Sequence, residues 1–151
     1  MDSSGYAYKG KDIEAERLAR TTVGRFLFRY VTPRFLVEKN VKQAYTNPNI
    51  VTHALVDRYY DMMRRAGNRD TFIKLCNVPL EDLSAHIQAI RVPTLILWGR
   101  KDVTIPVEYA EKFNRDIAGS KLIYYEGVGH VPQQEIPEQS AKDAALFLAE
   151  K

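Results

Sequence analysis

The sequence has a single cysteine, Cys76, among its 151 residues. One cysteine cannot form a disulfide within the chain, and a domain of this size without disulfides is typical of a reducing compartment. The longest apolar runs, such as TLILW at 94–98, are far too short to cross a bilayer, and the N-terminus lacks the apolar segment of a signal peptide. These absences predict a cytoplasmic protein with no membrane partner.

Dense runs of like charge are also missing, and the net charge is only +3. Residues 1–75 carry 14 Lys and Arg against 8 Asp and Glu, whereas residues 76–151 carry 8 against 11. Basic and acidic residues are interspersed even in the basic half, as in KGKDIEAERLAR at 9–20. We interpret them as solvated helix faces and expect no nucleic-acid partner.

Metal-ligand patterns are poorly represented as well. His53 and Asp57 lie four residues apart on a predicted helix, a spacing at which two side chains can bind one metal ion. No third ligand follows at a suitable spacing, so an exposed polar pair is the favoured interpretation. We expect neither a metal nor a cofactor.

The first half of the chain has the pattern of short amphipathic helices. Thr21 and Thr22 are suitable N-caps, and TNPN at 46–49 predicts a turn. Gly67 and Asn68 are expected to end the helix that follows this turn, and a short helix is expected at 70–76. One face of the helix before Gly67 carries Leu55, Tyr59, Met62 and Met63.

The second half changes character near Ile90. TLILWG at 94–99 is a continuous apolar run of strand length, typical of a strand buried on both faces. A helical pattern at 107–119 follows, then a second strand pattern at 121–127 and a helical pattern at 137–148. This order predicts a right-handed crossover between two parallel strands.

Two polar residues fall just past the predicted strand ends. Asp102 follows the first strand in GRKD, and His130 follows the second in GVGH. Because the carboxyl ends of parallel strands meet at one edge of a sheet, we expect the two side chains to lie together. A carboxylate beside an imidazole fixes its tautomer and stabilises the imidazolium form. Gly127 and Gly129 would allow the turn that presents the ring.

These segments resemble the C-terminal third of α/β-hydrolase-fold enzymes. The resemblance rests on VPTLILWGRKD at 92–102 and on KLIYYEGVGHVPQQEIPEQSAKDAALFL at 121–148. In that family the last two strands carry the acid and the histidine of a nucleophile–acid–histidine triad. The resemblance implies that Asp102 is the acid and His130 the base. The Glu135-Ile136-Pro137 step also fits the family's entry into a final helix.

The resemblance gives a provisional domain plan. Residues 1–11 would be the end of a core strand and a linker, residues 12–88 a helical cap, and residues 89–151 the C-terminal subdomain with acid and histidine. The expected fold class is therefore α/β, as the C-terminal part of the hydrolase fold behind a helical cap. If the cap closes over the site, Trp98, Tyr59, Met62 and Met63 would line a substrate pocket, although simple packing is the commoner role of such residues.

The family's nucleophile elbow is absent from the sequence. No G-x-S-x-G occurs, nor its Asp or Cys counterpart, and Cys76 sits in a short apolar segment typical of packing. We therefore expect the nucleophile (Ser, Asp or Cys) to lie outside this chain, which would be a fragment of a hydrolase and inactive alone.

Two functional hypotheses follow. In the first, the complete enzyme hydrolyses an ester, amide or related bond of a small, apolar substrate. In the second, the chain is a non-catalytic binding or self-associating module of the same fold. Because a two-stranded sheet is marginal in isolation, we also expect the chain to bind a complementary N-terminal half or to self-associate.

Overall fold

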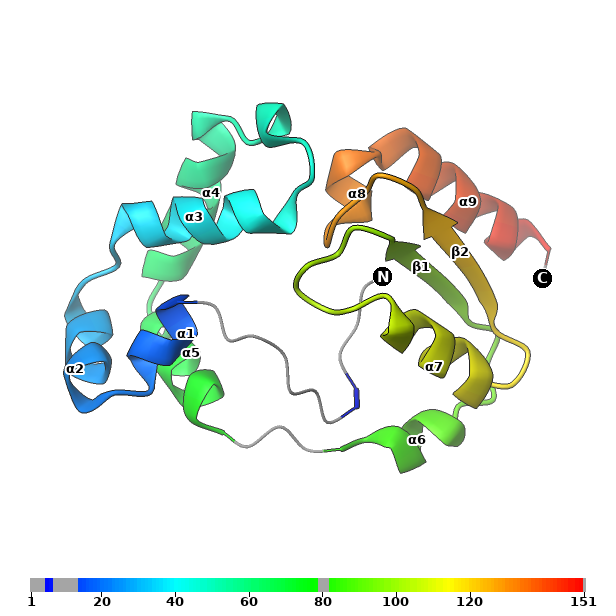
Figure 1. Ribbon diagram of the computed structural model, residues 1–151, viewed down its shortest axis with the longest axis horizontal. Coiled ribbons are helices and arrows are strands. Elements are labelled where there is room, and N and C mark those ends of the chain that lie inside the picture. Colours follow the sequence, from blue (N-terminus) through cyan, green and yellow to red (C-terminus); the bar gives the residue numbers. More distant parts are fainter. Residues whose placement is uncertain (1–4, 7–13, 79–81, 151) are drawn as a thin grey trace. The chain divides into compact units, whose positions relative to one another are not determined.

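A computed structural model describes residues 5–6, 14–78 and 82–150 (Figure 1). The chain divides into two compact units. The first, here called the sheet unit, comprises residues 1–9, 44–47 and 81–151, and the second, the helical unit, comprises residues 10–43 and 48–80. The helical unit takes up most of the range 12–88, whose role as a cap stays a prediction; residues 44–47 and 81–88 of that range belong to the sheet unit. The predicted strand end at 1–11 lies outside the described residues except for Gly5 and Tyr6, which are not in a strand.

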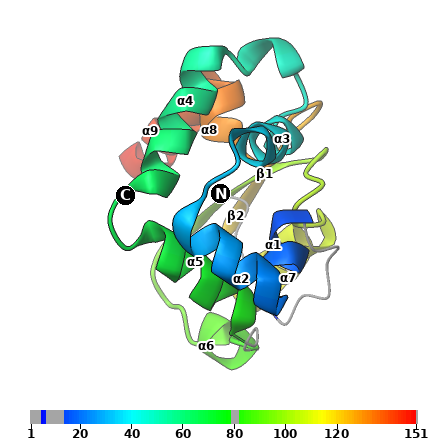
Figure 2. The ribbon, with the colours of Figure 1, turned by 90° about the vertical axis from the view of Figure 1, so that its left-hand side faces the viewer.

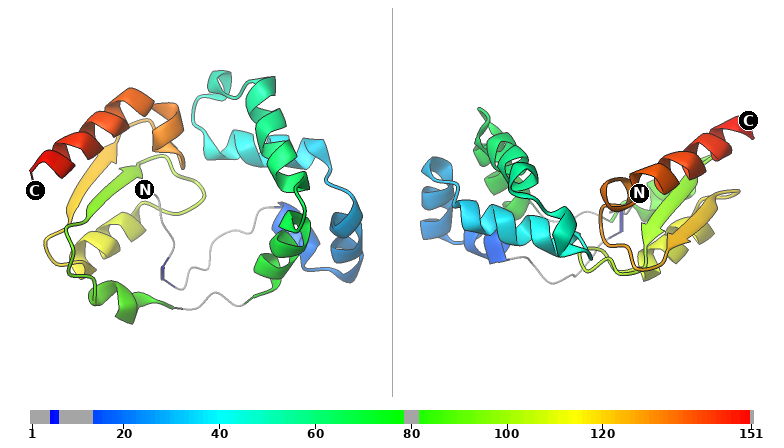
Figure 3. Two further views of the ribbon diagram at one scale, coloured as in Figure 1. Left: turned by 180° about the vertical axis from the view of Figure 1, so that it is seen from behind. Right: turned by 90° about the horizontal axis from the view of Figure 1, so that it is seen from above.

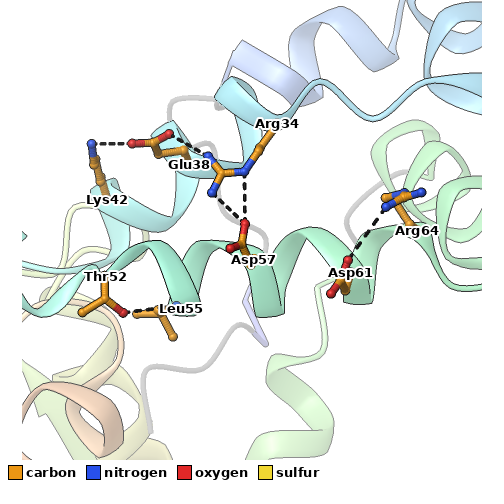
Figure 4. Close-up of polar contacts among 8 residues, drawn as sticks. All are labelled: Arg34, Glu38, Lys42, Thr52, Leu55, Asp57, Asp61 and Arg64. Carbon is orange, nitrogen blue, oxygen red and sulfur yellow. Dashed lines mark hydrogen bonds and ion pairs between the residues drawn. The ribbon is translucent and has the colours of Figure 1, made fainter.

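The helical unit is built from short helices. In chain order these are α1 (Glu14–Ala19), α2 (Thr22–Tyr30), α3 (Arg34–Ala44), the 3-10 turn η1 (Pro48–Ile50), α4 (His53–Arg64) and α5 (Asn68–Asn77). The Thr21 hydroxyl accepts a hydrogen bond from the Gly24 N–H at 2.9 Å and so caps α2, as the sequence predicts. Thr52 caps α4 in the same way through the Leu55 N–H at 3.2 Å (Figure 4).

The core of the helical unit lies between α1, α2 and α5, which pack side by side (Figure 2). Small alanines on α1 allow this close packing, and Phe28 of α2 meets Phe72 of α5 edge to face with ring centroids 5.8 Å apart. Cys76 is buried here, which confirms its interpretation as a packing residue. The buried members of this core are Ala15, Ala19, Phe28, Leu36 and Cys76.

The end of α4 corrects one detail of the sequence analysis. Gly67 and Asn68 were expected together to end this helix, but α4 ends at Arg64 and Asn68 is the first residue of α5. Gly67 has a left-handed backbone with φ of 83°, which glycine adopts without steric cost. Gly67 therefore lies between the two helices, and α5 begins two residues earlier than the predicted helix at 70–76.

The sheet unit contains the predicted crossover. Its elements are α6 (Ser84–Gln88), β1 (Leu95–Gly99), α7 (Glu108–Asp116), β2 (Lys121–Tyr125), α8 (Pro132–Glu135) and α9 (Pro137–Ala149). Strands β1 and β2 are parallel, with Leu95 opposite Lys121 and Gly99 opposite Tyr125. The prediction of two parallel strands joined through a helix is confirmed. Within the described ranges, no helix combines the length and apolar character needed to cross a membrane.

Strand β1 is covered on both faces (Figure 3). On one face Ile96 and Trp98 pack with Ala110 and Phe113 of α7. On the other face Leu97 packs in a smaller cluster beneath α8 and α9. This alternation explains why LILW at 95–98 is apolar at every position: side chains that point to either face of the strand are removed from water.

Candidate active site

Asp102 and His130 lie together at the carboxyl edge of the sheet. The Asp102 Oδ2 atom is 2.8 Å from the His130 Nδ1 atom. The Asp102 side chain has no exposed surface, whereas 26% of the His130 side chain is exposed. A buried carboxylate thus contacts an imidazole that solvent can reach.

Backbone hydrogen bonds explain how residues 28 positions apart meet. The Arg100 N–H donates to the Tyr125 carbonyl at 3.0 Å, and the Lys101 N–H donates to the Val128 carbonyl at 2.9 Å. These bonds extend the strand pairing beyond β1 and β2 into the two loops. The loops therefore leave the sheet side by side, with Asp102 and His130 at their ends.

The carboxylate of Asp102 is held by its own loop. Its Oδ1 atom accepts the N–H groups of Thr104 at 2.7 Å and Ile105 at 3.0 Å. Only Oδ2 then faces the imidazole, and because a carboxylate accepts hydrogen bonds, the Nδ1 atom of His130 carries the proton. This tautomer leaves the lone pair on Nε2, the arrangement that a general base requires.

Two glycines permit the close approach of these loops. A Cβ atom on Gly99 would lie 2.1 Å from the Gly129 carbonyl oxygen and 2.5 Å from that of Val128, which are backbone atoms that cannot rotate away. A Cβ atom on Gly129 would lie 2.7 Å from the Ala44 carbonyl oxygen. Gly127 has a left-handed backbone with φ of 72°, whereas Gly129 does not. Gly127 therefore has the role in the turn that was expected of Gly127 and Gly129. Gly129 is required for a different reason, because no space remains beside its Cα atom for a side chain.

Known proteins provide an independent comparison, although no family model matches the chain. A 2-hydroxy-6-oxononadienedioate/2-hydroxy-6-oxononatrienedioate hydrolase of Klebsiella pneumoniae is 32% identical over 103 residues, which cover 66% of this chain and 36% of the hydrolase. A monoacylglycerol lipase of Bos taurus is 36% identical over 67 residues, 44% of this chain and 20% of the lipase.

Solved structures agree with these relatives. A meta-cleavage product hydrolase from Pseudomonas fluorescens superposes with a TM-score of 0.75 at 16% identity, over 99% of this chain and 54% of that protein. A thermophilic esterase from Thermogutta terrifontis gives a TM-score of 0.71 at 23% identity, over 99% of this chain and 54% of the esterase. The chain has the α/β-hydrolase fold.

The chain spans 36% of the Klebsiella hydrolase and about half of these solved structures. Its fold class is that of the C-terminal part of an α/β-hydrolase, with two parallel strands and flanking helices. In this family the edge of the sheet that carries Asp102 and His130 is the usual place for chemistry.

The residues expected to line a substrate pocket lie in three different settings. Trp98 has no exposed surface and lies in the core of the sheet unit, so it is a packing residue and does not line a pocket. Tyr59 and Met63 line a largely apolar cavity of about 150 Å³ within the helical unit. Met62 does not line this cavity, and 41% of its surface is exposed.

The polar pair His53 and Asp57 does not form a metal site with other described residues. Asp57 instead accepts two hydrogen bonds from the Arg34 guanidinium, at 2.7 and 3.2 Å (Figure 4). Among the residues that the structure describes, no group of three or more His, Cys, Asp or Glu side chains could hold a metal ion.

Sequence reasoning missed two residues that hold the histidine loop, Thr46 and Glu135. Thr46 was interpreted as turn chemistry, and Glu135 was noted only as part of the approach to the last helix. The two residues are 89 positions apart and bond directly to each other. No local pattern signals such a contact.

Proposed function

We propose that this chain supplies the acid and the base of an α/β-hydrolase-fold hydrolase that cleaves an ester, amide or related bond. The observation that carries the proposal is the 2.8 Å contact between Asp102 Oδ2 and His130 Nδ1, made by a carboxylate whose second oxygen accepts two backbone N–H groups. A turn aspartate and a loop histidine without a shared role would not need this pairing.

In the proposed mechanism His130 is the general base and then the general acid. Its Nε2 atom takes the proton of the attacking hydroxyl or water and returns it to the leaving group. Asp102 keeps the ring in the Nδ1–H tautomer and stabilises the positive charge that develops on it. Burial strengthens this interaction, because solvent does not screen a side chain with no exposed surface.

The nucleophile would come from a part of the enzyme beyond residues 1–151. The sequence has no elbow motif with Ser, Asp or Cys between the two glycines. A serine nucleophile would form an acyl-enzyme, whereas an aspartate would form an alkyl-enzyme ester in dehalogenation or epoxide opening, with His130 activating water. By this proposal the chain alone has no turnover.

We further propose an apolar small-molecule substrate and a complementary N-terminal half as the partners. The apolar lining of the cavity beside Tyr59 and Met63 supports the first. For the second, β1 pairs with β2 alone among the described residues, and a two-stranded sheet is marginal in water. Self-association of the chain is the alternative way to cover this edge.

The first experiment is to read the coding DNA upstream of the Met1 codon. An open frame that runs into a G-x-S-x-G or G-x-D-x-G elbow would assign the nucleophile. The protein from the natural reading frame is then assayed with p-nitrophenyl butyrate. For a serine elbow, we expect His130→Gln to lower kcat/KM by at least about 10³-fold.

The matched control is His53→Gln, which makes the same change at an exposed histidine of the helical unit. It should retain wild-type turnover. If the natural protein has a serine elbow and its turnover is the same with and without His130, the proposal is wrong. A stop codon just upstream of Met1, with no turnover by the chain, would favour the non-catalytic binding module.

A further inference from the structure

A four-residue segment from the middle of the chain lies against the histidine loop. Residues 44–47 belong to the sheet unit, although the residues on both sides of them belong to the helical unit. The His130 N–H donates to the Ala44 carbonyl at 2.9 Å. The Tyr45 side chain is buried, and its hydroxyl donates to the Gln134 side-chain oxygen. The backbone of the candidate base is thus bonded to a segment that is distant in sequence.

Glu135 joins this segment to the loop. Its Oε1 atom accepts the Gly129 N–H at 2.7 Å, and its Oε2 atom accepts the Thr46 N–H at 3.0 Å. The Thr46 hydroxyl is 2.6 Å from Oε2 and also 2.6 Å from the Gly127 carbonyl oxygen. Because a hydroxyl has one proton, it donates to one of these oxygens at a time. One carboxylate therefore binds groups on both segments, and bonds to a charged acceptor are the stronger kind.

Helix α8 gives no reason of its own for an acid at this position. Glu135 is the last residue of α8, but this helix has only four residues and Glu135 also stands in its first turn, so the helix dipole does not favour an acid there. The contacts of Glu135 with Gly129 and Thr46 explain why a glutamate stands at this position, whereas the stability of α8 does not.

We propose that Glu135 is a positioning residue for His130, and this inference rests on the proposed role of His130 as general base. The backbone on the N-terminal side of His130 is fixed at three points: Glu135 holds the Gly129 N–H, Ala44 accepts the His130 N–H, and the Gly129 carbonyl lies against Gly99. These contacts set the position of the His130 Cα atom, while Asp102 sets the rotation of the ring. A catalytic group displaced by about 1 Å can lose about 10²-fold in rate.

Glu135→Gln tests the carboxylate with little change in shape. The amide has one acceptor oxygen, so its NH₂ group must face either the Gly129 N–H or the Thr46 N–H, and one of the two bonds is lost. Glu138→Gln is the matched control, because it removes the same charge from an exposed residue in the first turn of α9. Thr46→Val removes the hydroxyl at nearly constant volume, and Thr46→Ser keeps the hydroxyl.

The experiment uses the protein expressed from its natural reading frame, and it measures both turnover and the ring resonance of His130. With p-nitrophenyl butyrate, Glu135→Gln and Thr46→Val should lower kcat, by up to about 10²-fold, with KM little changed, whereas Glu138→Gln and Thr46→Ser retain wild-type kcat. In ¹⁵N-labelled protein, the His130 Nδ1–H resonance should shift or broaden in the first two variants only. His130→Gln assigns that resonance by its loss.

The two measurements separate this inference from the proposed function. If the natural protein has a serine elbow and yet no turnover, the proposed function fails, and the Nδ1–H resonance still decides the role of Glu135. Unchanged kcat and an unchanged resonance in both Glu135→Gln and Thr46→Val would overturn the inference. If one variant does not fold, the other decides. Loss of folding in both would show a structural role and would also overturn it.

Discussion

Replacing Asp102 with asparagine should reverse the tautomer of His130 without moving the ring. In the wild type, Oδ1 accepts two backbone N–H groups and Oδ2 faces Nδ1. An asparagine side chain has nearly the same shape but only one acceptor oxygen. That oxygen is required by Thr104 and Ile105, so the NH₂ group must take the place of Oδ2. Since NH₂ donates, Nδ1 must accept and the ring proton moves to Nε2.

The energies favour this orientation over the flipped amide. In the flipped form the NH₂ group would face two backbone donors; because these are only partly buried, each one left unpaired costs about 1 kcal/mol, the low end of the usual range. Retaining the Nδ1–H tautomer would therefore cost about 2 kcal/mol. With Nε2 protonated, His130 cannot take the proton of a nucleophile. We expect kcat to fall by about 10⁴-fold, as in related triads, which corresponds to about 5.4 kcal/mol of activation free energy.

The assay for the tautomer is a long-range ¹H–¹⁵N correlation spectrum of the histidine rings. Asp102→Asn should exchange the protonated-nitrogen and lone-pair shifts of His130, while the amide spectrum of the sheet unit stays close to that of the wild type. Asp61→Asn is the control, because Asp61 is exposed and its Arg64 partner is 3.9 Å away. Observation of the Nδ1–H tautomer in Asp102→Asn would refute the reasoning.

Three further predictions concern stability and pH. Gly99→Ala should lower the melting temperature and broaden the His130 ring signals, because its Cβ atom meets backbone oxygen at 2.1 Å; wild-type melting and ring signals would contradict this. Trp98→Ala should lower the free energy of unfolding by about 3–5 kcal/mol in urea titrations. Trp98→Phe should lower the free energy of unfolding by less than Trp98→Ala, because it leaves a smaller cavity and removes an indole N–H without a partner among the described residues. Equal reductions in the two variants would contradict the packing argument. Burial, and then the hydrogen bond to Asp116, raises the pKa of Tyr6 to about 12, so the folded state favours the protonated phenol. The resulting stabilisation is complete below pH 10 and is lost as the pH rises toward 12; Tyr6→Phe should flatten the urea-unfolding free energy over that range, and an unchanged slope would rule this out.

The sequence predicted the strands more securely than the helix ends. The apolar run that becomes β1 fixes a strand, because residues of a parallel strand covered on both faces must be apolar or shielded. In the second run, Lys121 is exposed and the four residues that follow are buried or half-buried. The helix boundary at Gly67 was harder to predict from the sequence. A glycine followed by an asparagine is compatible both with the end of a helix and with a short connection between two helices. Local energies are similar for the two, and packing of α5 in the core of the helical unit decides between them.

The order of strands and polar residues along the chain is enough to expect Asp102 and His130 at one edge of the sheet, since parallel strands end together. The sequence by itself also indicated the α/β-hydrolase fold, through motifs whose spacing follows the strand and loop lengths. Tertiary structure alone decided how that edge is held. Gly99 meets the carbonyl of Gly129, and Glu135 bonds to Thr46 across 89 positions. Such contacts depend on the distance between backbones after folding, and no periodicity or composition records that distance.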